Sequence, residues 1–325
     1  MSKARQLADL GNVYDDGALS NRNLIINGAM QVAQRGTSST ASGYQVLDRI
    51  FINHSGGAAT VSQEEATFGN EVLGEFKNWM KFDATTGDNY LGFQTRLEDV
   101  RSLKEGTATF SFYAKGTNPN SGSYVVGLQR LPAGASGSTL DTPLDSTVTI
   151  TSTWTRYTFT FDVPALGTSV TENANSQLYL YVAQEGTDTS TDAWELNITG
   201  LQLEQGNTAT PFEHRSYGEE LALCQRYCFQ LNGADYAAMG MKDGSLEVFF
   251  PFPVTMRSQP TVHWSGVLGD YAIRSGGVDY TPTSFSQLGI RDYHYGWVRI
   301  TNSSVGATGY VTGNANGFIR FDSEL

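Results

Sequence analysis

The chain has 325 residues, a formal net charge of −12 at pH 7 and a pI near 4.7. Nucleic-acid binding depends largely on Lys and Arg that release counterions from phosphates, so this charge excludes nucleic acid as the main ligand and favours a neutral or weakly charged one. Charged residues make up only 17% of the chain and 35 residues are Gly, which is typical of a turn-rich β protein. The sequence has no apolar run of about 18 residues and no apolar signal-peptide core, so we expect a chain that stays soluble in the cytoplasm where it is made.

The first expected element is a helix of one or two turns at residues 3–10, with apolar positions at Leu7 and Leu10. A helix this short is unstable in isolation. We therefore expect residues 1–22 to form an attachment or oligomerisation segment that docks on sister chains or on a larger assembly. A frayed terminus is the alternative.

From Asn23 onward, short runs of β-branched and aromatic residues are separated by clusters of turn-forming residues, a spacing typical of a β-sandwich. In residues 155–163, Tyr157, Phe159 and Phe161 alternate with polar residues, so one face of this strand is predicted to be apolar. The predicted strands of this region are 24–32, 49–53, 107–116, 123–131, 146–151, 155–163, 177–184 and 193–206.

The strongest helix signal lies at residues 218–227, where Glu219 and Glu220 occupy the first turn and Arg226 lies near the end, in agreement with the helix dipole. Further strands are predicted after it, at 245–254, 260–264, 271–274, 296–302, 308–313 and 317–323. The sequence thus predicts a mostly β protein: the N-terminal segment 1–22, a sandwich at 23–212, a linker helix at 213–228 and a second, smaller β-sandwich domain at 229–325.

The two cysteines, Cys224 and Cys228, lie four residues apart in this helical pattern. A disulfide within one helical turn is geometrically poor, and no histidine lies nearby to complete a zinc site. We predict two buried free thiols.

Several segments carry a resemblance to a known family. They are NRNLIINGAMQVAQRGTS at 21–38 with YQVLDR at 44–49, ATFSFYAKG at 108–116, TSTWTRYTFTFDVP at 151–164, ITGLQLEQGNTATPFEHRSYGEELALCQRYC at 198–228, and VTMRSQPTV at 254–262. They resemble bacteriophage tail-fibre and virion proteins whose central module is a jelly-roll sandwich of the carbohydrate-binding-module type. The loops between the strands match nothing in that family.

The resemblance implies a jelly-roll fold for residues 23–212 and a place in the virion, in a tail fibre assembled in the host cytoplasm. It also implies a homo-oligomer, a trimer in preference to a dimer, with other tail proteins bound through the N-terminal segment and with bacterial surface glycan as the ligand for host attachment. Some sandwiches of this kind bind no glycan and have a purely structural role in the particle. A purely architectural baseplate or capsid-decoration subunit, with no glycan ligand, is therefore the alternative.

Jelly-roll modules of this type often hold a structural Ca²⁺ between their first and last strands, which would require oxygen ligands such as Asn27 and Glu204 to converge. The sequence leaves open whether a metal is bound, and no other cofactor is expected.

Patterns of catalytic residues are missing from the sequence. No histidine lies in a metal-binding or catalytic spacing, and no nucleotide-binding or nucleophile-elbow motif occurs. Adjacent carboxylates such as Glu64 and Glu65 point to opposite faces of a strand, so they do not form the pair of a glycosidase. His214 is expected to be structural. We predict no enzymatic activity and no catalytic residue.

The segment RDYHYGW at 291–297 is the densest group of ligand-binding side chains. Flat rings stack on the apolar face of a sugar while charged groups bond its hydroxyls. The candidate binding residues are Arg291, Asp292, Tyr293, His294, Tyr295 and Trp297. The same alternation of aromatic residues equally describes one buried face of a strand.

Since the N-terminal segment is the expected attachment point, residues 229–325 are expected to form the distal tip. Trp79, Trp154 and Trp194 are expected in the core.

Overall fold

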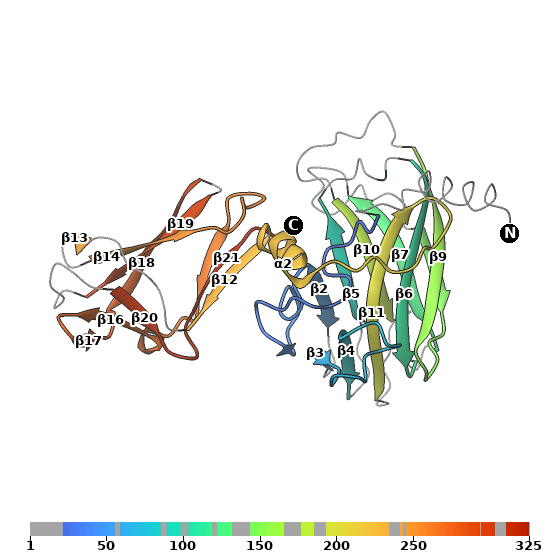
Figure 1. Cartoon of the computed structure of the whole chain (residues 1–325), viewed down its shortest axis with the longest axis horizontal. Helices are drawn as coiled ribbons and strands as arrows, with labels where there is room; N and C mark the ends of the chain where they lie inside the picture. Colours follow the sequence, from blue (N-terminus) through green and yellow to red (C-terminus); the bar gives the residue numbers. More distant parts are fainter. Residues whose placement is uncertain are drawn as a thin grey trace, which may run out of the picture. The chain divides into compact units, whose positions relative to one another are not determined.

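The computed structural model describes residues 22–55, 59–85, 90–98, 103, 105–118, 122–131, 144–165, 177–184, 193–233, 241–242, 245–292, 294–302 and 310–324. The predicted attachment segment lies outside these residues except for Arg22. The chain divides into a larger unit that extends to Glu220 and a smaller unit at Leu221–Glu324. Figure 1 labels the elements of both.

The larger unit is a jelly-roll sandwich of two antiparallel sheets (Figure 1). The six-stranded sheet has the order β1 (Ser38–Ser39), β3 (Ala59–Glu65), β4 (Asn78–Ala84), β11 (Trp194–Gln205), β6 (Gly106–Gly116) and β9 (Thr155–Val163). The five-stranded sheet has the order β2 (Ile50–Ser55), β5 (Tyr90–Leu97), β10 (Gln177–Gln184), β7 (Tyr124–Leu131) and β8 (Leu144–Val148). From β2 to β11, most consecutive strands pass from one sheet to the other, the topology of a jelly roll. This confirms the predicted fold class.

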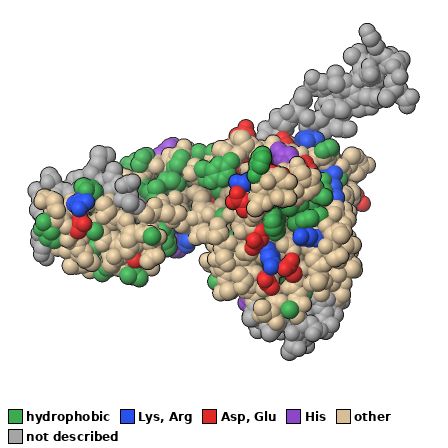
Figure 2. All heavy atoms as spheres, turned by 60° about the horizontal axis from the view of Figure 1, so that its bottom comes forward, with side chains coloured by type: hydrophobic (Ala, Val, Ile, Leu, Met, Phe, Trp, Pro, Cys, Tyr) green, Lys and Arg blue, Asp and Glu red, His purple; other side chains and the backbone are tan. Residues whose placement is uncertain are grey.

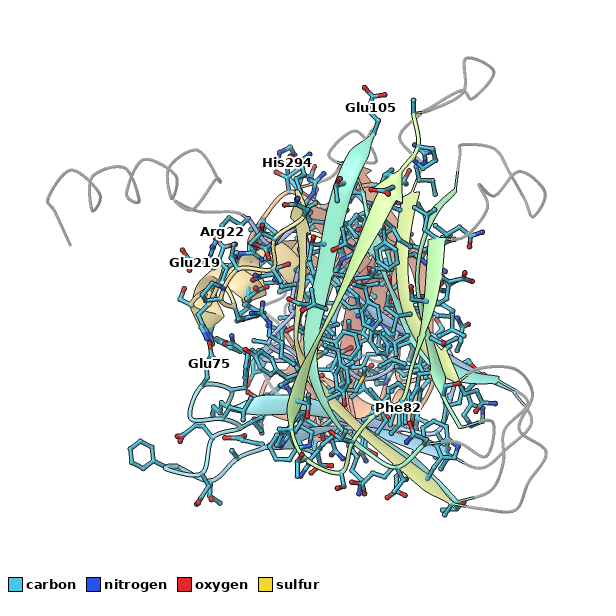
Figure 3. All side chains as sticks on the ribbon, turned by 90° about the vertical axis from the view of Figure 1, so that its right-hand side faces the viewer. Arg22, Glu75, Phe82, Glu105, Glu219 and His294 are labelled. Carbon is cyan, nitrogen blue, oxygen red and sulfur yellow. The ribbon has the colours of Figure 1, made fainter. Side chains whose placement is uncertain are left out.

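The core of the larger unit lies between these sheets. In β4, for example, Met80 and Phe82 are buried and alternate with partly exposed residues, because successive side chains of a strand point to opposite faces. The ring of Phe82 stacks on Phe93 of the opposite sheet, with 6.1 Å between centroids. Figure 3 shows Phe82 within the sandwich, whereas Glu105 points away beyond one end of β6.

The strand predicted at 24–32 is wrong. Most of its apolar residues are buried, but the segment forms turns, with positive φ at Asn27 and Met30. The Asn27 side chain forms hydrogen bonds with the backbone, where a strand would have hydrogen bonds to a neighbouring strand. Its Nδ2 donates to the carbonyls of Val32 and Asp48 at 2.8 and 3.0 Å, and its Oδ1 accepts a hydrogen bond from the Val32 amide at 2.9 Å. Asparagine tolerates the left-handed region better than most residues, so this position favours a turn. The other predicted strands of the larger unit are present.

A buried ion pair lies next to this turn. Arg35 Nη1 lies 3.3 Å from Asp48 Oδ1, and both side chains are at most 1% exposed. Asp48 also accepts hydrogen bonds from the backbone amide and the side-chain amide of Gln34. The residues of the QRG and LDR motifs thus form one polar cluster inside the larger unit.

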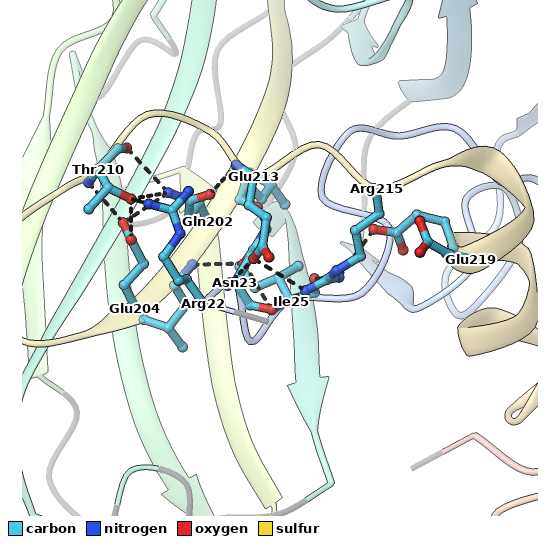
Figure 4. Close-up of polar contacts among 12 residues, drawn as sticks. Arg22, Asn23, Ile25, Gln202, Glu204, Thr210, Glu213, Arg215 and Glu219 are labelled. Atoms are coloured by element: carbon cyan, nitrogen blue, oxygen red, sulfur yellow. Dashed lines mark hydrogen bonds and ion pairs between the residues drawn. The ribbon is translucent and has the colours of Figure 1, made fainter. Parts of the chain in front are cut away.

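A second polar network joins the start of the described chain to the segment after β11 (Figure 4). Gln202 donates to Glu204 Oε2 at 2.9 Å and accepts the backbone amide of Glu213 at 2.7 Å. Glu213 in turn accepts the backbone amide of Asn23 at 2.7 Å. Arg215 Nη1 donates to the carbonyl of Ile25 at 3.0 Å. The motif residues of 21–38 and 198–228 therefore meet in space, and their role here is structural.

The helix α2 spans Tyr217–Gln225, close to the predicted range. Glu219 Oε2 accepts the backbone amide of Ser216 at 2.8 Å, and the Glu219 amide donates to Ser216 Oγ at 3.3 Å. This is a capping box, which explains where the helix begins. Cys224 lies in the helix and Cys228 begins the next strand; both are buried and neither is in a disulfide, as predicted.

The described residues of the smaller unit form three small antiparallel sheets. The first sheet has the order β12 (Cys228–Asn232), β21 (Phe318–Asp322) and β15 (Thr261–Trp264). The second has the order β13 (Met241–Lys242), β14 (Ser245–Pro251), β19 (Tyr295–Thr301) and β18 (Ser284–Asp292). The third has the order β17 (Val278–Tyr280), β16 (Tyr271–Ser275) and β20 (Tyr310–Gly313). A 3₁₀ turn at Leu268–Asp270 precedes β16. One hydrophobic core contains buried residues from all three sheets, among them Val298, Ile273 and Phe321. Every strand predicted in this region is present.

Among the described residues, no helix combines the length and the apolar character that crossing a bilayer requires.

Candidate functional site

The segment RDYHYGW lies where β18 turns back into β19. Arg291 and Asp292 end β18, and His294 is exposed just before β19. The side chains of Arg291 and Asp292, and Tyr293 as a whole, lie outside the described residues. Asp292 pairs with Tyr295 across the two strands.

The two faces of β19 differ in burial. Val298 and Ile300 point into the core of the smaller unit, and Gly296 lies on the same buried face. A Cβ at Gly296 would stand 2.1 Å from Cε1 of the Phe321 ring, so only glycine lets Phe321 pack here. Tyr295 and Trp297 therefore lie on the opposite face, where both remain partly exposed.

The neighbouring strand β14 adds Phe249 and Glu247 to this opposite face. Phe249 is directly across from Trp297, and Glu247 is across from Arg299, so each pair shares one side of the sheet. The Phe249 and Tyr295 ring centroids are 6.4 Å apart, and the Arg299 guanidinium carbon lies 5.5 Å from the centroid of the Trp297 ring.

An ion pair between Arg299 Nη2 and Glu247 Oε1 completes this surface, and both of its side chains are about one-third exposed, at 35% and 32%. We call Glu247, Phe249, Tyr295, Trp297 and Arg299 the β14–β19 face. It offers aromatic rings beside charged groups that form hydrogen bonds. Sequence reasoning missed Glu247 and Phe249, although the alternation in SLEVFFP places both on the face opposite to Leu246, Val248 and Phe250.

The two calcium candidates have other partners. The Asn27 amide is engaged by Val32 and Asp48, while Glu204 accepts hydrogen bonds from Gln202 and from the backbone amide of Thr210. Among the described residues, no group of three or more His, Cys, Asp or Glu side chains is placed to hold a metal ion. Calcium binding stays a prediction.

The tryptophans expected in the core differ in their environments. Trp194 is buried and packs edge-on against Tyr124, with 5.7 Å between centroids. Trp79 and Trp154 are partly buried and pack against a small hydrophobic cluster of Ala29, Val72, Phe76 and Phe212, so the core expectation holds for them only in part. They lie on the outer face of the six-stranded sheet, where His214 also contacts Phe76 and Phe212 of this cluster and its Nε2 lies 2.9 Å from Glu75 Oε1.

No family model matches the chain, and no curated protein matches it in sequence. The chain is distantly similar in fold to carbohydrate-binding modules and to a phage tailspike domain. The tailspike match is the enzymatically active domain of tailspike protein 4 from bacteriophage CBA120, at 11% identity and a TM-score of 0.39; it covers 57% of this chain and 22% of that chain.

Two further solved structures illustrate the similarity. A putative sugar binding protein from Bacteroides thetaiotaomicron is 16% identical, with a TM-score of 0.38, and the match covers 57% of this chain and all of the other. The family 11 carbohydrate-binding module of a cellulosomal cellulase from Clostridium thermocellum is 14% identical, with a TM-score of 0.33, and the match covers 54% of this chain and 98% of the other. These similarities concern the fold.

Proposed function

We propose that this chain is a non-enzymatic subunit of a phage tail fibre that attaches the virion to a saccharide on the host surface. The virion assignment rests on the sequence motifs of residues 21–49 and 198–228. The ligand assignment rests on the β14–β19 face, where aromatic rings and an ion pair lie side by side and partly exposed.

The chemistry of this face suits a sugar. An aromatic ring stacks on the apolar face of a pyranose, and carboxylate and guanidinium groups bond its hydroxyls. The mutual pairing of Glu247 and Arg299 holds both groups in place and leaves the face with no net charge of its own. A neutral saccharide therefore fits better than a charged one.

Truncation of Trp297 tests this proposal. Free protein is expected to block adsorption of phage to host cells. The Trp297→Ala protein should need a concentration about tenfold higher or more for the same inhibition, because an anchoring aromatic residue contributes over about 1.4 kcal/mol to binding. The melting temperature should change little. The matched control is Tyr310→Ala, which removes an exposed aromatic ring from another sheet of the same unit and should leave the block intact. Unaffected adsorption with intact free protein would instead support the architectural role.

The attachment role also implies an oligomer. We propose a homotrimer, with residues 1–22 joining the subunit to other tail proteins, since fibres of the resembling family assemble around a threefold axis. Light scattering at micromolar concentration should return about three times the chain mass of 35.4 kDa. A mass equal to that of one chain would contradict the proposal.

A further inference from the structure

A second surface with ligand-binding chemistry lies on the larger unit, on the outer face of the six-stranded sheet. Trp79 and Lys81 come from β4, Asn197 from β11 and Lys115 from β6, and Trp154 immediately precedes β9. In the register of the sheet, Asn197 is directly opposite both Lys81 and Lys115. Figure 2 shows acidic and basic side chains gathered beside hydrophobic ones on one face of this unit.

The two indole rings meet above the middle of the sheet. β4 and β9 are separated by β11 and β6, which places their backbones roughly 14 Å apart. The centroids of Trp79 and Trp154 are nevertheless only 6.3 Å apart, at an interplanar angle of 78°. Trp79 Nε1 donates to Asn197 Oδ1 at 2.9 Å, which fixes the orientation of this ring. We call this arrangement the tryptophan platform.

A charged ladder flanks the platform. Lys81 Nζ lies 2.9 Å from Glu195 Oε2 and 3.2 Å from Asp83 Oδ2, and Asn197 Nδ2 donates to Glu195 Oε1 at 2.6 Å. The hydrogen bond that Lys81 donates to Glu195 lowers the pKa of Glu195 and raises the pKa of Lys81. Both groups are therefore charged at neutral pH. Glu195 and Asp83 remain 44% and 52% exposed, so their oxygens can accept further hydrogen bonds.

Lys115 differs from the other lysines of this sheet. Its ammonium nitrogen lies 5.3 Å from the centroid of the Trp154 ring. Lys81 and Lys77 each form an ion pair, whereas Lys115 forms none with the residues that the structure describes. Its charge acts on Glu195 only at longer range. The platform thus carries a cation with no direct counter-ion in the described part of the chain, whose net charge is −12 overall.

We propose that the tryptophan platform binds a saccharide that bears a carboxylate, such as a uronic acid. The sugar ring stacks on the indole surfaces, its carboxylate pairs with Lys115, and its hydroxyls donate to Glu195 and Asp83. This site lies on a different unit from the β14–β19 face and takes a ligand of different charge. Its existence does not depend on the function proposed for that face.

Calorimetric titration of the full chain with a panel of acidic oligosaccharides tests the site. The panel contains oligomers of galacturonate, glucuronate and sialic acid, each compared with its carboxyl-reduced neutral counterpart. At least one acidic oligomer should bind, and its neutral counterpart should bind about tenfold or more weakly, the loss expected when a charged hydrogen bond is removed. Failure of the whole panel to bind, or equal affinity for an acidic oligomer and its neutral form, would overturn the proposal.

Variants then assign the binding to Lys115. Lys115→Met should weaken binding of the acidic oligomer by about tenfold, and Lys115→Arg should retain most of it. Lys77→Met is the matched control, because Lys77 lies on the same unit but already forms an ion pair, with Glu65. Trp297→Ala should bind the acidic oligomer normally, which separates this site from the β14–β19 face. Unchanged affinity in Lys115→Met would reject the assignment.

Discussion

Asp48→Ala is expected to destabilise the larger unit by about 3–5 kcal/mol, because it removes one partner of a buried ion pair. The Asp48 side chain is fully buried, and it accepts hydrogen bonds from Arg35 and Gln34. Without this carboxylate, the Arg35 guanidinium loses its counter-charge in a place that water does not reach. The desolvation penalty of that cation is then no longer offset.

Urea unfolding of the full chain, followed by tryptophan fluorescence, measures this loss. The control is Glu65→Ala, which removes the partner of Lys77 in a pair that is 2.8 Å long but largely exposed. An exposed pair contributes about 0–1 kcal/mol, so this variant should unfold almost like the parent chain. If Asp48→Ala proves no less stable than Glu65→Ala, the buried pair does not hold this region together.

The sequence predicted strands best where one face of the strand is apolar and the other polar. Residues 155–163 and 177–184 match β9 and β10 in both bounds. The same reasoning overlooked β4, where Lys81 and Asp83 belong to a ladder of paired charges on the outer face. It also placed a strand at 24–32, because apolar residues are frequent there. Most of these residues are indeed buried, but turns built around Asn27 bury them, not a strand.

The candidate sites were less predictable than the fold. The composition of RDYHYGW pointed to Tyr295 and Trp297, but Phe249 and Glu247 join them only through the pairing of β14 with β19. That register is a property of the folded sheet, since residues distant in the chain become neighbours across strands. The tryptophan platform likewise draws Trp79 from β4, Lys115 from β6 and Trp154 from the residue before β9, and no local pattern links them.

Glu220→Ala should cost the larger unit about 2–4 kcal/mol, the range expected when a buried donor and a largely buried cation both lose their acceptor. Glu220 is 4% exposed. Its Oε2 accepts the backbone amide of Asn27 at 2.7 Å, and its Oε1 accepts Arg215 Nη1 at 3.2 Å. Alanine favours helix more than glutamate does, so a loss of stability would report on these tertiary contacts and not on the propensity of α2.

The adjacent Glu219 provides the control, because it lies in the same helical turn but is exposed, and its carboxylate accepts hydrogen bonds from Ser216 at the helix start. Glu219→Ala should therefore lower stability far less than Glu220→Ala in the same urea titration. The double variant Arg215→Ala with Glu220→Ala should lose less than the sum of the two single losses, since each single variant already breaks the same ion pair. Additive losses would mean that Arg215 and Glu220 act independently, and that their contact does not tie the residues around Asn27 to the helix.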